Sequence, residues 1–128
     1  MIRFIPRVFF LVLIVGVVAS CRTAPVLNVV ETPFTTKAPS IEAADKAVKR
    51  AGAALGWQMK TVDSGHILAT LPIRTHIAVV DVKFNTGDFS ILYKSSTNLK
   101  YEGGSIHSNY NGWVTNLRDG IIAQSALF

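Results

Sequence analysis

The chain has 128 residues, of which 49% are hydrophobic, and it carries a formal net charge of +5 at pH 7. A chain of this length has room for one hydrophobic core, which argues against a second domain. The first 20 residues hold two of the 13 basic groups, so residues 21–128 keep 11 basic and 8 acidic groups, a net charge of +3. This mild excess is no signature of a nucleic-acid-binding protein.

The N-terminus has the pattern of a secretory signal peptide. Arg3 and Arg7 give it a positively charged start, and an unbroken apolar run follows from Val8 to Ala19. This run is short for a transmembrane helix, which needs about 20 apolar residues, but it suits the apolar region of a signal peptide. Residues 1–20 are therefore predicted to be a signal peptide.

The residues Val18-Ala19-Ser20-Cys21 resemble the lipobox of bacterial lipoproteins. The resemblance implies that Cys21 receives a diacylglycerol, that the chain is cut before it, and that the new amine is acylated. Two or three acyl chains hold a protein on a membrane far more firmly than one. By resemblance to enterobacterial lipoproteins, Arg22 after the cysteine implies transfer to the outer membrane, and the domain is expected to face the periplasm. The alternatives are an ordinary signal peptide near an unrelated cysteine, or an uncleaved anchor helix.

Residues 21–39 are expected to be a tether that holds the domain away from the membrane. Pro25, Pro33 and Pro39 occur there among threonines and small residues, a composition typical of linkers. Within this segment, Val26–Val30 is apolar and β-branched enough to pair as an edge strand. The pattern leaves open whether that strand forms.

A helix is predicted to begin after Ser40, a good N-cap residue, with Glu42 in its first turn, where the helix dipole favours an anion. Apolar residues then recur at spacings of three and four, so that one stripe faces a core. The stripe consists of Ile41, Ala44, Val48, Ala51 and Leu55. Gly56 marks the C-terminal end of the helix.

From Trp57 onward the apolar residues alternate with polar ones, which indicates β-strands. Short turns separate the strands, and Asn85–Asp88 contains a glycine that suits a hairpin. The predicted strands are Trp57–Val62, Ile67–Ile73, His76–Phe84 and Phe89–Lys94. Four strands joined by short turns make an antiparallel meander.

A second helix is predicted near the C-terminus, with Ser105 or Ser108 as its N-cap, because apolar residues return to helical spacing. These residues are Ile106, Tyr110, Trp113, Leu117 and Ile121. The expected fold is α+β: a helix, a four-stranded antiparallel meander and a C-terminal helix, with both helices on one face of the sheet. An extra N-terminal edge strand is optional. Residues 40–128 form this single domain.

The residues of catalytic and metal sites do not occur here at the necessary spacings. His66, His76 and His107 are the only histidines, and no cysteine pair or suitably spaced carboxylate accompanies them. The sequence has no Gly-x-Ser-x-Gly motif and no carboxylate pair suited to glycoside hydrolysis. We therefore expect no metal, no cofactor and no enzymatic activity, and an enzyme is the least favoured interpretation.

Polar and aromatic residues are concentrated between the fourth predicted strand and the second helix. The candidate binding surface consists of Tyr93, Ser96, Asn98, Lys100, Tyr101, His107, Asn111 and Trp113. Flat rings with polar tips and side-chain amides suit a peptide, a glycan or a protein partner. The alternative is a lock within the fold, in which Ser96 and Asn98 cap a turn while Tyr110 and Trp113 fill the core.

This region resembles a family of small bacterial lipoproteins of uncharacterised function. They share a Tyr-x-x-Ser-x-Asn-Leu-x-Tyr element, here Tyr93–Tyr101, and an Ile-His-x-x-Tyr-Asn-x-Trp-Val helix, here Ile106–Val114. The resemblance implies a location and a fold but no catalytic residues. The expected function is a non-catalytic envelope accessory or assembly factor that binds a protein partner and no nucleic acid. The alternative is a periplasmic binder of a small ligand or a cell-wall glycan.

Overall fold

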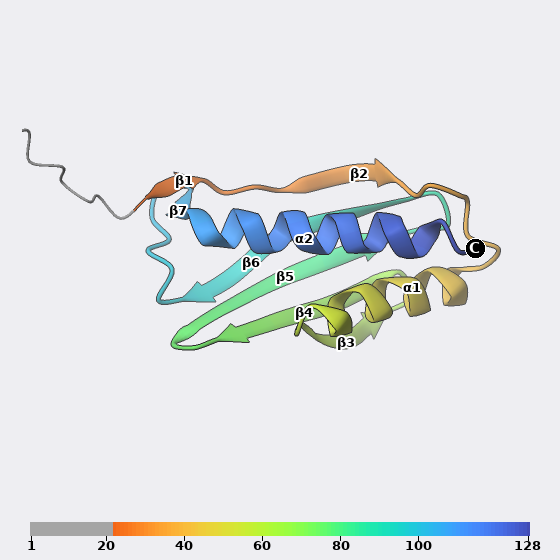
Figure 1. Cartoon of the computed structure of the whole chain (residues 1–128), viewed down its shortest axis with the longest axis horizontal. Coiled ribbons are helices and arrows are strands. Elements are labelled where there is room, and N and C mark those ends of the chain that lie inside the picture. The colour runs from red at the N-terminus through yellow and green to blue at the C-terminus, as the bar shows by residue number, and fades with distance from the viewer. Residues whose placement is uncertain (1–21) are drawn as a thin grey trace, which may run out of the picture.

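The computed structural model describes residues 22–128, so the predictions for the signal peptide and for Cys21 lie outside the described residues. This part of the chain forms two helices and seven strands (Figure 1). The helices are α1 (Ile41–Ala54) and α2 (Ser108–Ser125). The strands are β1 (Thr23–Pro25), β2 (Val29–Pro33), β3 (Gln58–Asp63), β4 (His66–Ile73), β5 (His76–Phe84), β6 (Asp88–Thr97) and β7 (Ser105–His107).

Five strands make one antiparallel sheet in the order β2-β6-β5-β4-β3. The predicted four-stranded meander is confirmed as β3 to β6. The optional N-terminal edge strand also forms, as β2, but it spans Val29–Pro33 rather than Val26–Val30. Pro33 ends this edge strand, where the missing N–H of proline is tolerated.

Both helices lie side by side on one face of the sheet, as predicted (Figure 1). Alanines on the buried side of α1 allow a close approach, and a Cβ added at Gly120 of α2 would lie 3.5 Å from Cβ of Ala51. The core lies between the two layers. Its largest fully buried side chains include Tyr110, Phe89 and Ile67. No helix of residues 22–128 covers the opposite face of the sheet (Figure 1).

The ends of α1 agree with the sequence prediction, whereas the start of α2 does not. Ser40 Oγ accepts a hydrogen bond from Ala43 N at 3.1 Å, and Gly56 follows the helix with a φ of 89°. The prediction of Ser105 or Ser108 as the N-cap of α2 is wrong. His107 is the cap, and its Nδ1 accepts from Asn109 N at 3.1 Å. The residues before the helix belong to strand β7, so the helix begins only after this strand.

The expectation of a tether over residues 21–39 is corrected for residues 22–39, which are part of the folded domain. β1 pairs with β7, and β2 pairs with β6. Phe34 and Ala38 are only 6% and 3% exposed. A proline-rich composition indicates a linker only when the apolar residues of the segment have no core to enter. This segment does enter the core, because the Phe34 ring packs on the Phe89 ring with centroids 5.5 Å apart.

Hydrogen bonds to α2 reinforce this attachment of the N-terminal segment. Ser125, which is fully buried, accepts from Thr35 N at 2.8 Å through its Oγ and donates to Ile122 O at 2.7 Å.

In residues 22–128 no helix has the length and apolar character needed to cross a membrane.

Candidate functional site

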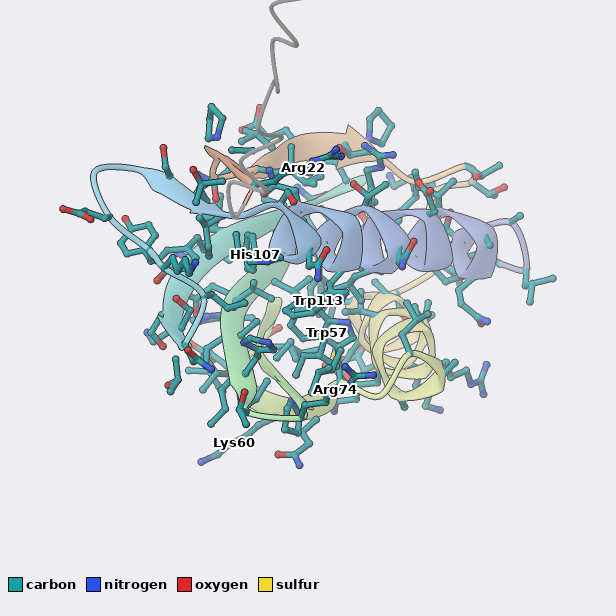
Figure 2. All side chains as sticks on the ribbon, turned by 60° about the vertical axis from the view of Figure 1, so that its left-hand side comes forward. Arg22, Trp57, Lys60, Arg74, His107 and Trp113 are labelled. Atoms are coloured by element: carbon teal, nitrogen blue, oxygen red, sulfur yellow. The ribbon has the colours of Figure 1, made fainter. Side chains whose placement is uncertain are left out.

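The candidate residues gather at one end of the molecule. We call this the β1–β7 end and define it as residues 22–25, 73–76 and 97–108, together with the side chains packed on them. Here β1 pairs with β7, the β4–β5 turn meets the segment after β6, and α2 begins. Figure 2 brings this end forward and shows Arg22, His107 and Arg74 on it.

Tyr93 and Ser96 make their polar contacts inside the protein. The Tyr93 ring stacks on Tyr101 with centroids 4.3 Å apart, and its hydroxyl lies 2.8 Å from Ser96 Oγ. On its other side it meets the Tyr110 ring at 5.6 Å, nearly edge-on. These contacts fix the orientation of the stack, so only Tyr101, which is 49% exposed, offers a ring to a partner.

Tyr110 is the inner end of the tyrosine cluster and is fully buried. Its hydroxyl is buried and has no hydrogen-bond partner in residues 22–128. Burial, and then the nearby Tyr93, raise the pKa of Tyr110 above its ordinary value. The ring therefore fills the core, as the lock interpretation requires, and its hydroxyl stays protonated at every physiological pH.

The segment after β6 is pinned by a buried leucine between two residues in left-handed conformation. Asn98 has a φ of 58° and Lys100 a φ of 53°, while Leu99 between them is 1% exposed. Leu99 O accepts from His107 N at 2.8 Å, and Asn98 Nδ2 donates to Thr75 Oγ1 at 3.0 Å. Left-handed non-glycine residues persist only where their surroundings hold them. Lys100 is thus presented on a fixed backbone.

Asn111 clamps the N-terminal segment to α2. Its Oδ1 accepts from Leu27 N and its Nδ2 donates to Pro25 O, both at 2.9 Å. One amide thus satisfies two backbone groups in the connection between β1 and β2, and it has little left to offer a ligand.

His107 and Trp113 lie beside His76, and all three are half-buried. The His76 ring centroid is 6.4 Å from that of His107 and 6.3 Å from that of Trp113. His76 Nδ1 lies 2.6 Å from Asn98 O and must donate, because a carbonyl oxygen only accepts. Each histidine thus uses one ring nitrogen to hold the backbone. Within residues 22–128, no three His, Cys, Asp or Glu side chains are placed to hold a metal ion.

Two hollows that sequence reasoning missed lie away from the candidate residues. The larger, about 370 Å³, lies between the start of α1 and the β3–β4 turn. Its lining is Ile41, Glu42, Asp45, Lys46, Thr61, Asp63, Ser64 and Gly65. The second, about 270 Å³, lies between α1 and the C-terminus. The hollow beside Trp113 has only about 50 Å³, far below the usual size of a ligand site.

The face of the sheet opposite the helices, which we call the open face, was also outside the candidate set. Side chains alternate along β5, so Val79, Asp81 and Lys83 point away from the buried Val80 and Val82. Register places Leu68 and Leu92 on either side of Asp81 on this face.

The open face carries more positive than negative charge. Asp81 Oδ1 is 2.6 Å from His66 Nε2, and its Oδ2 is 3.9 Å from Lys94 Nζ. Lys60, which pairs in register with Leu68, and Lys83 are exposed on the same face. Neither takes part in the ion pairs found in residues 22–128. The alternation along a single strand could not reveal the charges that neighbouring strands add to this face.

A scan against protein-family models and searches of curated proteins and of solved structures found no match to the chain. The resemblance to small bacterial lipoproteins therefore stays an expectation from the sequence, and the function must be argued from the residues themselves.

Proposed function

We propose that the chain is a lipid-anchored protein of a bacterial cell envelope, attached through Cys21, and that its domain is a non-catalytic accessory or assembly factor that binds a protein partner. The proposed location is the outer membrane, on the periplasmic side. The attachment rests on the lipobox pattern, and the partner rests on the open face.

The fold of residues 22–128 is compatible with cleavage before Cys21. β1 begins at Thr23, and all elements of residues 22–128 follow the predicted cleavage site. Removal of residues 1–20 thus leaves each of these elements intact. The mature protein would start with the acylated cysteine and enter the folded domain almost at once.

Processing provides the first test. Cys21→Ser removes the thiol that takes the diacylglycerol, so we expect the uncleaved precursor to accumulate. Intact-mass spectrometry of the membrane fraction distinguishes this precursor from acylated mature protein. Normal cleavage of the serine variant after residue 20 would contradict lipoprotein processing.

The open face is the observation that carries the partner proposal. It combines half-buried aliphatic residues, Leu68, Val79 and Leu92, with exposed Lys60 and Lys83. Leu68 and Leu92 flank Asp81, whose carboxylate is paired with His66 and Lys94. Exposed apolar patches bordered by polar groups mark protein interaction sites. The lysines favour a partner with an acidic surface, because complementary charge guides and orients association.

Cross-linking in intact cells tests this surface. A photoreactive residue replaces Lys83 on the open face, and a matched one replaces Lys49 on α1. We expect a discrete protein adduct at position 83 only, and its loss when Lys60→Glu is added. Lys46→Glu in the position-83 background is the matched charge control, because Lys46 is exposed on α1 and takes no part in the ion pairs found in residues 22–128. Equal adducts at both positions, or none from abundant acylated protein, would contradict the proposal.

The larger hollow favours a second candidate, a binder of a small ligand or cell-wall glycan. At about 370 Å³ it reaches the lower range of ligand pockets, and Glu42, Asp45 and Lys46 offer charged groups at its wall. Titration calorimetry with soluble peptidoglycan fragments tests it. A saturable heat of binding that disappears in Asp45→Ala but persists in Lys100→Ala supports this site. The absence of any binding heat at millimolar fragment concentration would refute it.

A further inference from the structure

The polypeptide passes from the predicted lipid attachment into the fold without a linker. Arg22 O accepts from Ser108 N at 2.9 Å, and Val26 N donates to Gly104 O at the same distance. Between these two bonds, Thr23–Pro25 pair with β7. Cys21 is bonded directly to Arg22, and consecutive Cα atoms lie about 3.8 Å apart. Acyl chains on Cys21 would therefore leave the protein within one residue of the β1–β7 end.

The exposed charges differ between the two ends of the molecule. The β1–β7 end carries Arg22, Arg74 and Lys100 against one acid, Glu102. Figure 2 shows Arg22 and Arg74 at opposite sides of this end, so the positive charge spans it.

The far end, formed by residues 33–40, 63–66 and 84–88, has the opposite balance. It carries the exposed Asp63 and the half-buried Asp88 against the exposed Lys37. The basic end is thus the one next to the attachment point. Anionic lipid surfaces attract basic residues placed close to them.

An aromatic ring stands among these basic groups. Tyr101 is 49% exposed and adjoins Lys100, and its stack on Tyr93 holds it in place. Tyrosine is enriched at membrane–water interfaces, where its ring enters the headgroup region and its hydroxyl stays hydrated. The basic residues, the exposed tyrosine ring and the proposed lipid attachment therefore lie at the same end of the domain.

We propose that the β1–β7 end rests on the headgroups of the membrane that holds the lipid anchor. Arg22, Arg74 and Lys100 face lipid phosphates, and Tyr101 lies at headgroup depth. The proposal rests on the lipid attachment at Cys21 proposed above. α2 then leads away from the bilayer for about 27 Å, the length of 18 helical residues. The open face stands beside the membrane, free for a partner in the same leaflet.

Depth-dependent fluorescence quenching tests this orientation on the acylated full chain. Because acylation consumes the thiol of the only cysteine, an introduced cysteine is the single site for labelling. Lys100→Cys reports on the β1–β7 end, and Lys37→Cys, which is also exposed, reports on the far end. Each labelled protein is reconstituted into vesicles of phosphatidylethanolamine with about a quarter phosphatidylglycerol, with nitroxide-labelled lipid as quencher.

We expect strong quenching at position 100 and little at position 37. Equal quenching at both positions, or none at position 100, overturns the proposal. Arg74→Glu in the Lys100→Cys background should reduce quenching at least about twofold, while Lys46→Glu, on α1, should not. The same loss in both charge variants would remove the specific role of this end.

A spacer tests whether the short junction sets the orientation. Ten glycine and serine residues inserted between Cys21 and Arg22 add roughly 17 Å of root-mean-square reach. Quenching at position 100 should fall, and unchanged quenching contradicts the role of the junction. Intact mass separates the two proposals: unacylated Cys21 refutes the lipid attachment, whereas an acylated protein without quenching at position 100 refutes the orientation alone.

Discussion

Replacement of Asn111 by alanine should loosen the N-terminal segment from α2. The side chain makes two hydrogen bonds of 2.9 Å, to Leu27 N and to Pro25 O. Each such bond contributes about 1 kcal/mol net, and a donor left unsatisfied and part-buried costs about 1–3 kcal/mol. The gain in helix propensity from Asn to Ala, a few tenths of a kcal/mol, offsets part of this loss. We expect the free energy of unfolding to fall by about 2 kcal/mol.

Urea denaturation of the purified full chain, followed by tryptophan fluorescence, measures this loss. Asn116→Ala is the matched control, because Asn116 is exposed on the same helix and makes no side-chain hydrogen bond in residues 22–128. It carries the same change in propensity, so the difference between the variants isolates the clamp. Hydrogen exchange at residues 26–30 should accelerate in Asn111→Ala only. A difference below about 0.5 kcal/mol with unchanged exchange would refute the clamp.

Four further substitutions test other parts of the fold by the same denaturation assay. Tyr110→Phe removes a buried hydroxyl without a partner, so stability should stay level or rise by up to about 1 kcal/mol; a loss above about 1 kcal/mol would refute this account. Gly112→Ala should stabilise by about 0.5–1 kcal/mol, because nothing lies within 4 Å of the new Cβ. Gly65→Ala should instead destabilise, since φ is 73° and Phe84 O would lie 2.5 Å from the new Cβ. Equal effects of the two alanines would contradict the expected difference between these two sites. Trp113→Ala should lower the free energy of unfolding by about 2 kcal/mol, because the ring is half-buried, whereas removal of a fully buried aromatic ring costs about 3–5 kcal/mol. A loss below about 1 kcal/mol would mean that the ring does not stabilise the core.

The sequence predicts the elements whose signals are local. Ser40 caps α1 because its hydroxyl competes for nearby backbone groups, and the alternation along β4 to β6 places buried residues correctly. The N-terminal segment shows the limit of this reasoning. Whether Phe34 enters a core depends on Phe89, 55 positions later in the chain, and no local pattern encodes that contact.

The candidate site shows the same division between local and long-range information. The cluster of tyrosines and asparagines was found from composition, and the structure brings these residues to one end. Their roles could not be predicted, because Asn111 is occupied by the backbone of Pro25 and Leu27. The open face was missed because its charge is spread over β3 to β6 and appears only when the strands are placed in register.

The pairing of the first strand with the last has a consequence for the order in which the protein folds. β1 can pair only after β7 has been made, and Thr35 N can donate to Ser125 Oγ only after the end of the chain has been made. A chain that is made or exported from its N-terminus therefore completes these contacts last, because long-range pairs need both partners to be present. Until residues 104–111 have been made, residues 22–27 lack their hydrogen-bond partners, whereas β2 can already pair with β6. The segment next to the proposed lipid attachment is therefore among the last parts of the fold to close.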